Sequence, residues 1–254
     1  MEIQYHRWNS PALKRDMECK VYGHGGRPML FIPCQDGRFF DFENFHMADT
    51  LAPWIDEGQI MVFSIDTIDR ETWSNKKGDP RWRIERHENW IRYITDEMVP
   101  FMRNMANERN GWTGYPGVMV FGCSLGALHA ANLYFRFPDI FDCLLALSGV
   151  YSAEYGFDGY MDDLVYLNSP VHYLENMSAD HPYLKKYNLK KAVFSVGQGP
   201  WELPESTRQL QRVMDSKGIE AWVDYWGHDC AHDWDWWYKQ AVYFMPYLLG
   251  KNQG

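Results

Sequence analysis

Residues 118–135, VMVFGCSLGALHAANLYF, decide the fold of this chain. Residues 118–121 form a short apolar run with β-branched side chains, which predicts a buried strand. Residues 127–137 are rich in Ala, Leu and aromatic side chains and contain no Gly or Pro, which predicts a helix. Between them, residues 122–126 read GCSLG, a G-x-S-x-G pattern, so the strand must turn sharply into the helix.

Ser124 stands at the apex of this predicted turn. Gly122 and Gly126 let the strand and the helix approach each other closely, because neither carries a side chain. The turn lifts the Ser124 hydroxyl out of the sheet and aims the first N–H groups of the helix at whatever that hydroxyl attacks. A tight turn with an incidental serine is the alternative, but the strand–turn–helix context favours a nucleophile.

Composition narrows the class of protein. The chain has 254 residues, 46% of them hydrophobic and 17% aromatic, which suits one large α/β domain with a sizeable core. A net charge of -9 argues against a nucleic acid or an anionic membrane as partner. The five cysteines lack paired C-x-x-C spacing, and most lie in apolar runs, so we expect reduced thiols. No apolar run approaches the roughly 20 residues of a membrane span and no signal peptide is visible, so we expect a cytoplasmic protein.

Strand and helix patterns alternate along the chain. Residues 3–8 and 13–22 predict an antiparallel pair at one edge, whereas residues 150–188, rich in Tyr, Asp, Asn and Pro, predict a small cap insertion with short helices. The alternation predicts a mostly parallel, doubly wound sheet within a single domain over residues 1–254. The other predicted strands are 29–33, 60–66, 143–149, 191–197 and 221–226, and the other predicted helices are 42–54 (short and broken), 85–107 (interrupted by Pro100), 204–217 (capped by Gly218) and 234–249.

A serine hydroxyl needs a general base, normally His, and a carboxylate that orients this His. In this architecture the chain order is Ser, acid, His, with the acid after a late strand and the His after the last strand. Glu202 is the first carboxylate after the 191–197 strand, and Glu205 is the reserve. A solvated loop carboxylate is the alternative for Glu202. Two histidines, His228 and His232, follow the last strand, and position alone leaves both open.

These residues resemble an esterase family of the α/β-hydrolase fold, which includes esterase D-like enzymes, feruloyl and enterochelin esterases and the mycolyltransferases. The resemblance is carried by GCSLGA at 122–127, GQGPWEL at 197–203 and HDWDWW at 232–237. The family's H-D/S-W-x-x-W pattern after the last strand implies His232 as the base, and the segment around Glu202 implies that residue as the acid.

The same resemblance extends to the loop after the 29–33 strand, where residues 33–45 read PCQDGRFFDFENF. It implies an oxyanion-binding N–H from Gln35 or Asp36, beside the N–H of Leu125. An ordinary strand-to-helix loop is an equal alternative for this segment. The chain departs from the family in having Leu125 and Ala127 around the second elbow glycine, and its oxyanion loop lacks the double glycine of many esterases.

The sequence thus predicts a serine carboxylesterase that acts on a small-molecule ester through an acyl-enzyme on Ser124, without cofactor or metal. Trp73, Trp201 and Trp234 are candidate substrate-binding walls, with core packing as an equal alternative. Three other functions stay open: an acyltransferase that uses the same acyl-enzyme, a metal hydrolase built on the two histidines of 228–232, and a non-catalytic binding protein. The sequence does not define the oligomeric state or the identity of the ester.

Overall fold

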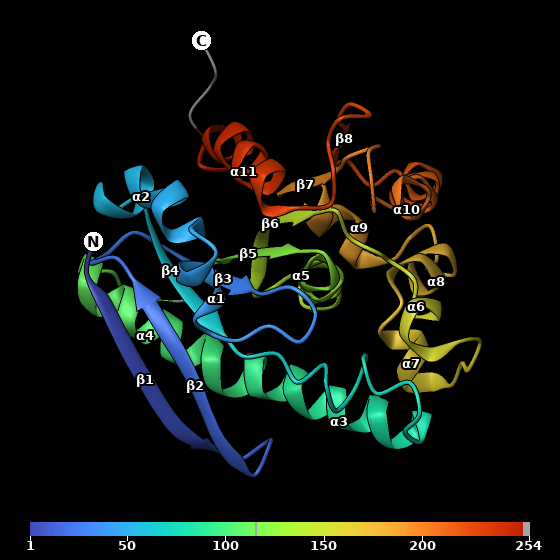
Figure 1. Cartoon of the computed structure of the whole chain (residues 1–254), viewed down its shortest axis with the longest axis horizontal. Helices are drawn as coiled ribbons and strands as arrows, with labels where there is room; N and C mark the ends of the chain where they lie inside the picture. The colour runs from blue at the N-terminus through green and yellow to red at the C-terminus, as the bar shows by residue number, and fades with distance from the viewer. Residues whose placement is uncertain (115, 251–254) are drawn as a thin grey trace. The chain divides into compact units, whose positions relative to one another are not determined.

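The computed structural model describes residues 1–114 and 116–250 (Figure 1). The chain forms two compact units, Met1–Met119 and Val120–Gly254. The expectation of a single domain stays a prediction, as does its extension over residues 251–254 and Tyr115, which lie outside the described residues. Within residues 1–114 and 116–250, no helix combines the length and the apolar character that crossing a membrane requires.

The strands of the first unit lie in the order β1-β2-β4-β3. β1 (Ile3–Ser10) and β2 (Arg15–Tyr22) form the predicted antiparallel pair. β2 is also antiparallel to β4 (Ile60–Ile65), whereas β3 (Arg27–Ile32) runs parallel to β4. β4 is buried along its whole length and β3 along all but its first residue, which explains their nearly continuous apolar sequences.

The helices of the first unit confirm the prediction of a short, broken helix around residue 45. They differ from the predicted long helix 85–107. The predicted helix 85–107 starts earlier, at Pro80, because Asp79 accepts a hydrogen bond from the Trp82 N–H at 2.8 Å and proline suits a first turn. The interruption is a π-helical segment just before Pro100, which has no N–H to donate. The elements are α1 (Asp41–Asn44), α2 (Met47–Asp56), α3 (Pro80–Arg92), η1 (Tyr93–Met98) and α4 (Val99–Asn110).

The strands of the second unit lie in the order β5-β6-β7-β8. They are β5 (Val118–Cys123), β6 (Phe141–Leu147), β7 (Lys191–Val196) and β8 (Trp222–Tyr225). β6 is parallel to β7, and β7 is parallel to β8. Their carboxyl ends therefore meet at one edge of the sheet, where open α/β sheets place their sites.

Three long helices and the predicted insertion complete the second unit. The long helices are α5 (Leu125–Arg136), α10 (Pro204–Lys217) and α11 (Trp234–Leu248). Gly218 ends α10 with φ +65°, as predicted for a helix cap. Residues 150–188 form short helices, drawn yellow to orange in Figure 1: α6 (Glu154–Phe157), α7 (Asp163–Leu167), α8 (Pro170–Glu175) and α9 (Pro182–Tyr187). A buried hydrogen bond of 2.7 Å from Asn132 to Asn168 joins α5 to this insertion.

Candidate active site

The turn between β5 and α5 has the geometry that the G-x-S-x-G pattern predicts. Ser124 has φ 57° and ψ -127°, a conformation that is unfavourable for a residue with a side chain. Its N–H donates to the Leu147 carbonyl at 2.9 Å, which ties the turn to β6. A Cβ added to Gly122 would lie 2.1 Å from the Gly126 carbonyl oxygen, so this close approach requires glycine. The prediction of a strand, a turn and a helix is confirmed, with the helix beginning at Leu125 rather than Ala127.

Leu125 is the first residue of α5, directly after Ser124. Its side chain is buried, and its N–H belongs to the first turn of the helix, where backbone donors have no partner within the helix. The Ser124 carbonyl accepts a hydrogen bond from the Ala127 N–H at 3.0 Å. The Leu125 N–H therefore lies at the elbow beside the serine, as an oxyanion donor must.

His232 joins the serine to a carboxylate. Its Nε2 lies 2.9 Å from Ser124 Oγ, and its Nδ1 lies 3.2 Å from Glu202 Oε2. The backbone is held at the same point, because the His232 N–H donates to the Pro200 carbonyl at 3.0 Å. Trp237 on α11 packs edge-on against the imidazole, with ring centroids 5.0 Å apart. The ring thus has one orientation, with both nitrogens hydrogen-bonded.

Glu202 is held by donors from three directions. Its side chain is only 1% exposed, so its oxygens depend on protein donors. Oε1 accepts from the Ser148 hydroxyl at 2.7 Å and from the Gly197 N–H at 3.2 Å, while Oε2 faces His232. Ser148 Oγ in turn accepts from Trp237 Nε1 at 2.9 Å. The carboxylate is therefore fixed on both oxygens.

Sequence reasoning missed both Ser148 and the hydrogen bond that it accepts from Trp237. Ser148 directly follows β6 and has φ +54°. Its hydroxyl therefore lies on a strained backbone at the carboxyl edge of the sheet. A serine at the carboxyl end of a parallel strand was the available signal. That signal gains weight only when Glu202 is known to lie across from it, because an isolated serine after a strand is common.

Two buried acidic groups close to Glu202 stay neutral near neutral pH. Burial raises the pKa of the Cys230 thiol to about 12, and the charges of Glu202 and Asp229 act in the same direction. Burial also raises the pKa of the Tyr151 hydroxyl, and the Glu202 charge adds to the shift. Neither group adds negative charge beside Glu202.

The two reserve candidates, His228 for the base and Glu205 for the acid, have other partners than Ser124. His228 is exposed, and its Nδ1 lies 3.3 Å from the Gln198 carbonyl oxygen. Glu205 has a side chain that is 69% exposed and pairs with Arg212 at 2.7 Å. The geometry therefore brings His232 and Glu202, and neither reserve, to Ser124.

The metal-hydrolase alternative has little support in the geometry. His228 and His232 lie in a loop before α11, whereas the H-E-x-x-H pattern needs one helix. Both ring nitrogens of His232 already face protein partners. In the part of the chain that the structure describes, no three His, Cys, Asp or Glu side chains form a group that could hold a metal ion.

The three candidate tryptophans have different surroundings. Trp201 is 88% exposed and has φ +66°, a strained conformation for so large a residue. Trp234 is half-buried and packs on Trp237, with ring centroids 5.2 Å apart. Trp73 is 1% exposed in the first unit and donates its Nε1–H to His87 Nδ1 at 3.2 Å. The placement of Trp73 fits the core-packing alternative that the sequence left open.

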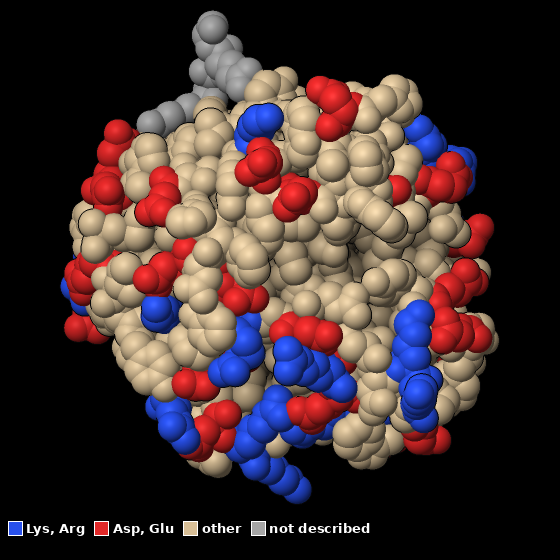
Figure 2. Space-filling model, in the orientation of Figure 1, with Lys and Arg blue, Asp and Glu red and all other residues tan. Residues whose placement is uncertain are grey.

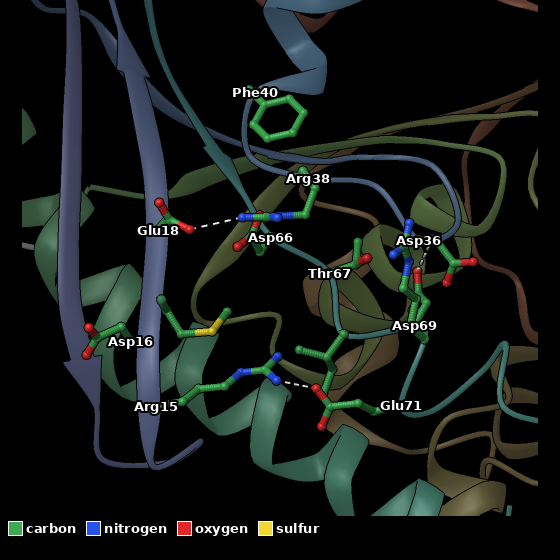
Figure 3. Close-up of a pocket in the computed structure, with 13 residues that line it drawn as sticks. Arg15, Asp16, Glu18, Asp36, Arg38, Phe40, Asp66, Thr67, Asp69 and Glu71 are labelled. Atoms are coloured by element: carbon green, nitrogen blue, oxygen red, sulfur yellow. Dashed lines mark hydrogen bonds and ion pairs between the residues drawn. The ribbon is translucent and has the colours of Figure 1, made fainter.

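Gln35 and Asp36 lie in a tight turn after β3, in the first unit. Gln35 is exposed and Asp36 is half-buried with φ +62°. The Asp36 N–H donates to Asp69 Oδ2 at 3.3 Å, so it already has an acceptor (Figure 3). Which of the two residues supplies an oxyanion N–H stays a prediction.

The elbow, the parallel strands and the order of serine, acid and histidine define a protein of the α/β-hydrolase class. The chain belongs to the Esterase family, whose model, described as "Putative esterase", matches residues 10–242. It is therefore a carboxylesterase of the serine hydrolase type, as the sequence predicted. No curated protein sequence matches the chain.

Solved structures of similar fold cover nearly the whole chain. A ferulic acid esterase has a TM-score of 0.75 at 15% identity, with 99% of each chain covered. The fluorophosphonate-binding serine hydrolase FphF of Staphylococcus aureus has a TM-score of 0.70 at 11% identity, with 98% of each chain covered. An S-formylglutathione hydrolase from Agrobacterium tumefaciens has a TM-score of 0.69 at 13% identity, with 98% of this chain and 95% of the other covered. These comparisons confirm the predicted α/β-hydrolase fold.

Proposed function

We propose that this protein hydrolyses carboxylic esters through an acyl-enzyme on Ser124, with His232 as the general base and Glu202 as the acid that orients it. One observation carries the proposal: Ser124 Oγ, the His232 ring and the Glu202 carboxylate form a continuous hydrogen-bonded chain, with links of 2.9 and 3.2 Å. A serine hydroxyl becomes a nucleophile at neutral pH when such a base accepts its proton.

Acylation follows from this arrangement. Ser124 Oγ attacks the ester carbonyl carbon while its proton passes to His232 Nε2. The negative charge that forms on the carbonyl oxygen is stabilised by the Leu125 N–H, and the second donor, which the sequence assigns to Gln35 or Asp36, stays a prediction. Each such donor contributes about 3–4 kcal/mol to the transition state in a serine protease. His232 then protonates the leaving alcohol as the C–O bond breaks.

Deacylation repeats these steps with water. His232 takes a proton from a water molecule, which attacks the acyl carbon, and then returns the proton to Ser124 Oγ as the acid leaves. Glu202 does not need to change protonation state, because its role is to hold the Nδ1–H tautomer and to stabilise the imidazolium. The Ser148 hydroxyl and the Gly197 N–H keep the carboxylate in place.

The substrate class is a small-molecule ester. Trp201 and Trp234 are the candidate walls for its acyl or alcohol part, because each lies within two residues of a triad residue in the sequence and neither is fully buried. One structure of similar fold is a ferulic acid esterase, so aryl esters belong in the first substrate panel. Such a panel should compare 4-nitrophenyl acetate, 4-nitrophenyl butyrate and methyl ferulate.

The decisive experiment uses a fluorophosphonate probe and intact mass spectrometry on the wild-type protein, Ser124→Ala and His228→Ala. We expect a single adduct on wild type, none on Ser124→Ala, and adduct formation on His228→Ala at close to the wild-type rate. His228→Ala is the matched control, because it removes an imidazole four residues from His232 without touching the hydrogen-bonded chain. A folded wild-type protein that forms no adduct would refute the proposal and favour a non-catalytic binding protein.

A further inference from the structure

A cavity of about 320 Å³ lies in the second unit, between α5 and the insertion of residues 150–188. Leu167 contributes an exposed apolar side chain to its lining. The other walls are mainly aromatic, with one ring each from α5, α7, α8 and α9: Phe135, Tyr166, Tyr173 and Tyr183. Flat apolar walls of this kind favour a planar ring as the bound group.

The lining of this cavity carries basic and no acidic charge. Arg136, the last residue of α5, is part of it, and no Asp or Glu is among the described residues that line it. Burial raises the pKa of the Tyr173 hydroxyl, so this group stays neutral at pH 7. Across the face drawn in Figure 2, by contrast, Lys and Arg side chains lie next to Asp and Glu side chains. The net positive charge of the lining favours an anion as ligand.

The guanidinium of Arg136 is held in place by its neighbours. Its Nη1 donates to Asn168 Oδ1 at 3.0 Å, and its central carbon lies 5.2 Å from the centroid of the Phe137 ring. Asn168 is fully buried and also accepts from Asn132 Nδ2 at 2.7 Å. Because a guanidinium has five N–H donors in a rigid fork, Arg136 can bind a carboxylate while it keeps its bond to Asn168.

Two other polar side chains of the lining are oriented by the protein. The Tyr173 hydroxyl donates to Asn132 Oδ1 at 3.1 Å, so one buried asparagine pair orients both Tyr173 and Arg136. His181 Nδ1 accepts from the Tyr183 N–H at 3.2 Å, so the proton of the neutral ring is on Nε2, which can donate it. Since these contacts are made within the protein, the polar groups need little further ordering to bind an anion.

The cavity is separate from the candidate active site. Ser124 directly precedes the first residue of α5, whereas Phe135 and Arg136 belong to the last turn of this helix. At a rise of about 1.5 Å per residue, the two ends of α5 are roughly 17 Å apart. A small ligand in the cavity therefore does not reach Ser124.

We propose that this cavity is a second binding site, for a small aromatic carboxylate: the ring packs among Phe135 and the tyrosines, and the carboxylate pairs with Arg136. A volume of about 320 Å³ is at the lower end for a ligand pocket, which suits a molecule with one or two rings. The proposal goes beyond ester hydrolysis and does not depend on it, because none of the described residues that line the cavity belongs to the chain from Ser124 to Glu202.

The test titrates 2-naphthoate against the protein and follows the ligand signals by NMR, with 2-naphthylmethanol as the uncharged ring. We expect saturable binding of 2-naphthoate and at least about tenfold weaker binding of the alcohol, because charge-assisted hydrogen bonds are the stronger ones. Arg136→Gln should weaken 2-naphthoate binding at least about tenfold for the same reason. The matched control is Arg212→Gln, which removes an exposed arginine that pairs with Glu205, and it should bind within about twofold of wild type.

A second variant tests the place of the ring without changing the charge. Leu167 lines the cavity and is 41% exposed, so the fold can accept a larger side chain there. Leu167→Trp should fill part of the cavity and weaken 2-naphthoate binding at least about tenfold, because the added ring occupies the space of the ligand. Thermal unfolding checks that each variant is folded, and Arg136→Met replaces Arg136→Gln if glutamine prevents folding.

Contrary outcomes are distinct from failure of the proposed function. Absence of saturable binding to wild type, or equal binding of 2-naphthoate and 2-naphthylmethanol, would overturn the second site. So would unchanged affinity in a folded Arg136→Gln or Leu167→Trp protein, or an equal loss in Arg212→Gln. Protein modified on Ser124 by the fluorophosphonate probe should bind 2-naphthoate as unmodified protein does, and loss of binding there would place the ligand at the active site instead. Failure of the probe to react would refute the proposed function and leave the second site standing.

Discussion

In the second unit, three loops bring side chains together: Ser124 after β5, Glu202 after β7 and His232 after β8. In the first unit, the loops after β3 and β4 meet differently: the Asp69 carboxylate accepts from the backbone N–H of Asp36, and the Ser74 hydroxyl bonds the side chains of Gln35 and Asp36. Chemistry done by side chains requires particular residue types and leaves a trace in the sequence. A backbone N–H can be supplied by almost any residue, so which N–H takes part depends on the contacts that fix its peptide plane.

The largest expected effect separates the two histidines of the second unit. His232→Ala should lower kcat/KM at least about 10³-fold, because the proton of Ser124 loses its acceptor. His228→Ala should stay within about threefold of wild type, because its exposed ring bonds the Gln198 carbonyl and is not part of the chain from Ser124 to Glu202. Hydrolysis of 4-nitrophenyl acetate measures both. Similar losses in two folded variants would mean that the hydrogen-bonded chain does not identify the base.

The two glutamates test in the same way which side chain acts as the acid. Glu202→Gln should lower kcat about 10²- to 10⁴-fold, because a neutral amide cannot stabilise the imidazolium and favours the wrong tautomer. Glu205→Gln should change kcat less than about twofold, because that carboxylate is exposed and pairs with Arg212. Steady-state kinetics on one ester gives the comparison. An unaffected Glu202→Gln would show that another group orients His232.

A smaller effect is expected at Ser148, which acts on Glu202 rather than on substrate. Ser148→Ala removes the hydroxyl that donates to Glu202 Oε1 and accepts from Trp237 Nε1. A hydrogen bond to a charged group contributes about 1.5–3 kcal/mol, so kcat should fall about 10- to 100-fold with little change in KM. Trp237→Phe should cost less, since it keeps the ring beside His232. A loss in Trp237→Phe larger than in Ser148→Ala would mean that packing, and not the hydrogen bond, fixes the acid.

The smallest expected effect is at Cys230, two residues before His232. Burial raises its pKa to about 12, so the thiol stays protonated and unreactive at pH 8, because the thiolate is the nucleophile. Iodoacetamide should leave Cys230 unmodified in the folded protein and alkylate it after unfolding in urea, as peptide mapping would show. In the unfolded chain the pKa returns to about 8.5, so the stability due to this burial is lost as the pH rises from about 9 to 12. Rapid alkylation of the folded protein at pH 8 would contradict the burial.

Much of the fold could be predicted, because strands β3 to β7 are largely apolar runs and several helices carry clear end signals. β5 and the elbow after it were specified by a strand pattern, two glycines and a serine. The long helix was predicted less well, since its earlier start depends on the Asp79 cap and its π segment on the fit around Pro100. Local sequence defines the type of an element better than its ends.

The candidate site divides in the same way. Ser124, Glu202 and His232 were predicted from chain order and from a family resemblance, and their side chains lie in one hydrogen-bonded chain. For Trp73 the sequence left a pocket wall and core packing equally open, because aromatic content does not say which rings are covered, and its indole lies in the core against His87. Ser148 could not be found, because its role exists only through its contact with Glu202, 54 residues away.

By itself the sequence determined the α/β class, the nucleophile elbow and the residue types of a serine esterase, since these depend on patterns local to the chain. Only the tertiary structure shows that His232 and Glu202, rather than His228 and Glu205, lie in one hydrogen-bonded chain with Ser124. Each choice rests on a hydrogen bond between segments that are distant along the chain. Such a bond forms where folding excludes water and fixes both partners, and neither condition can be read from one segment alone.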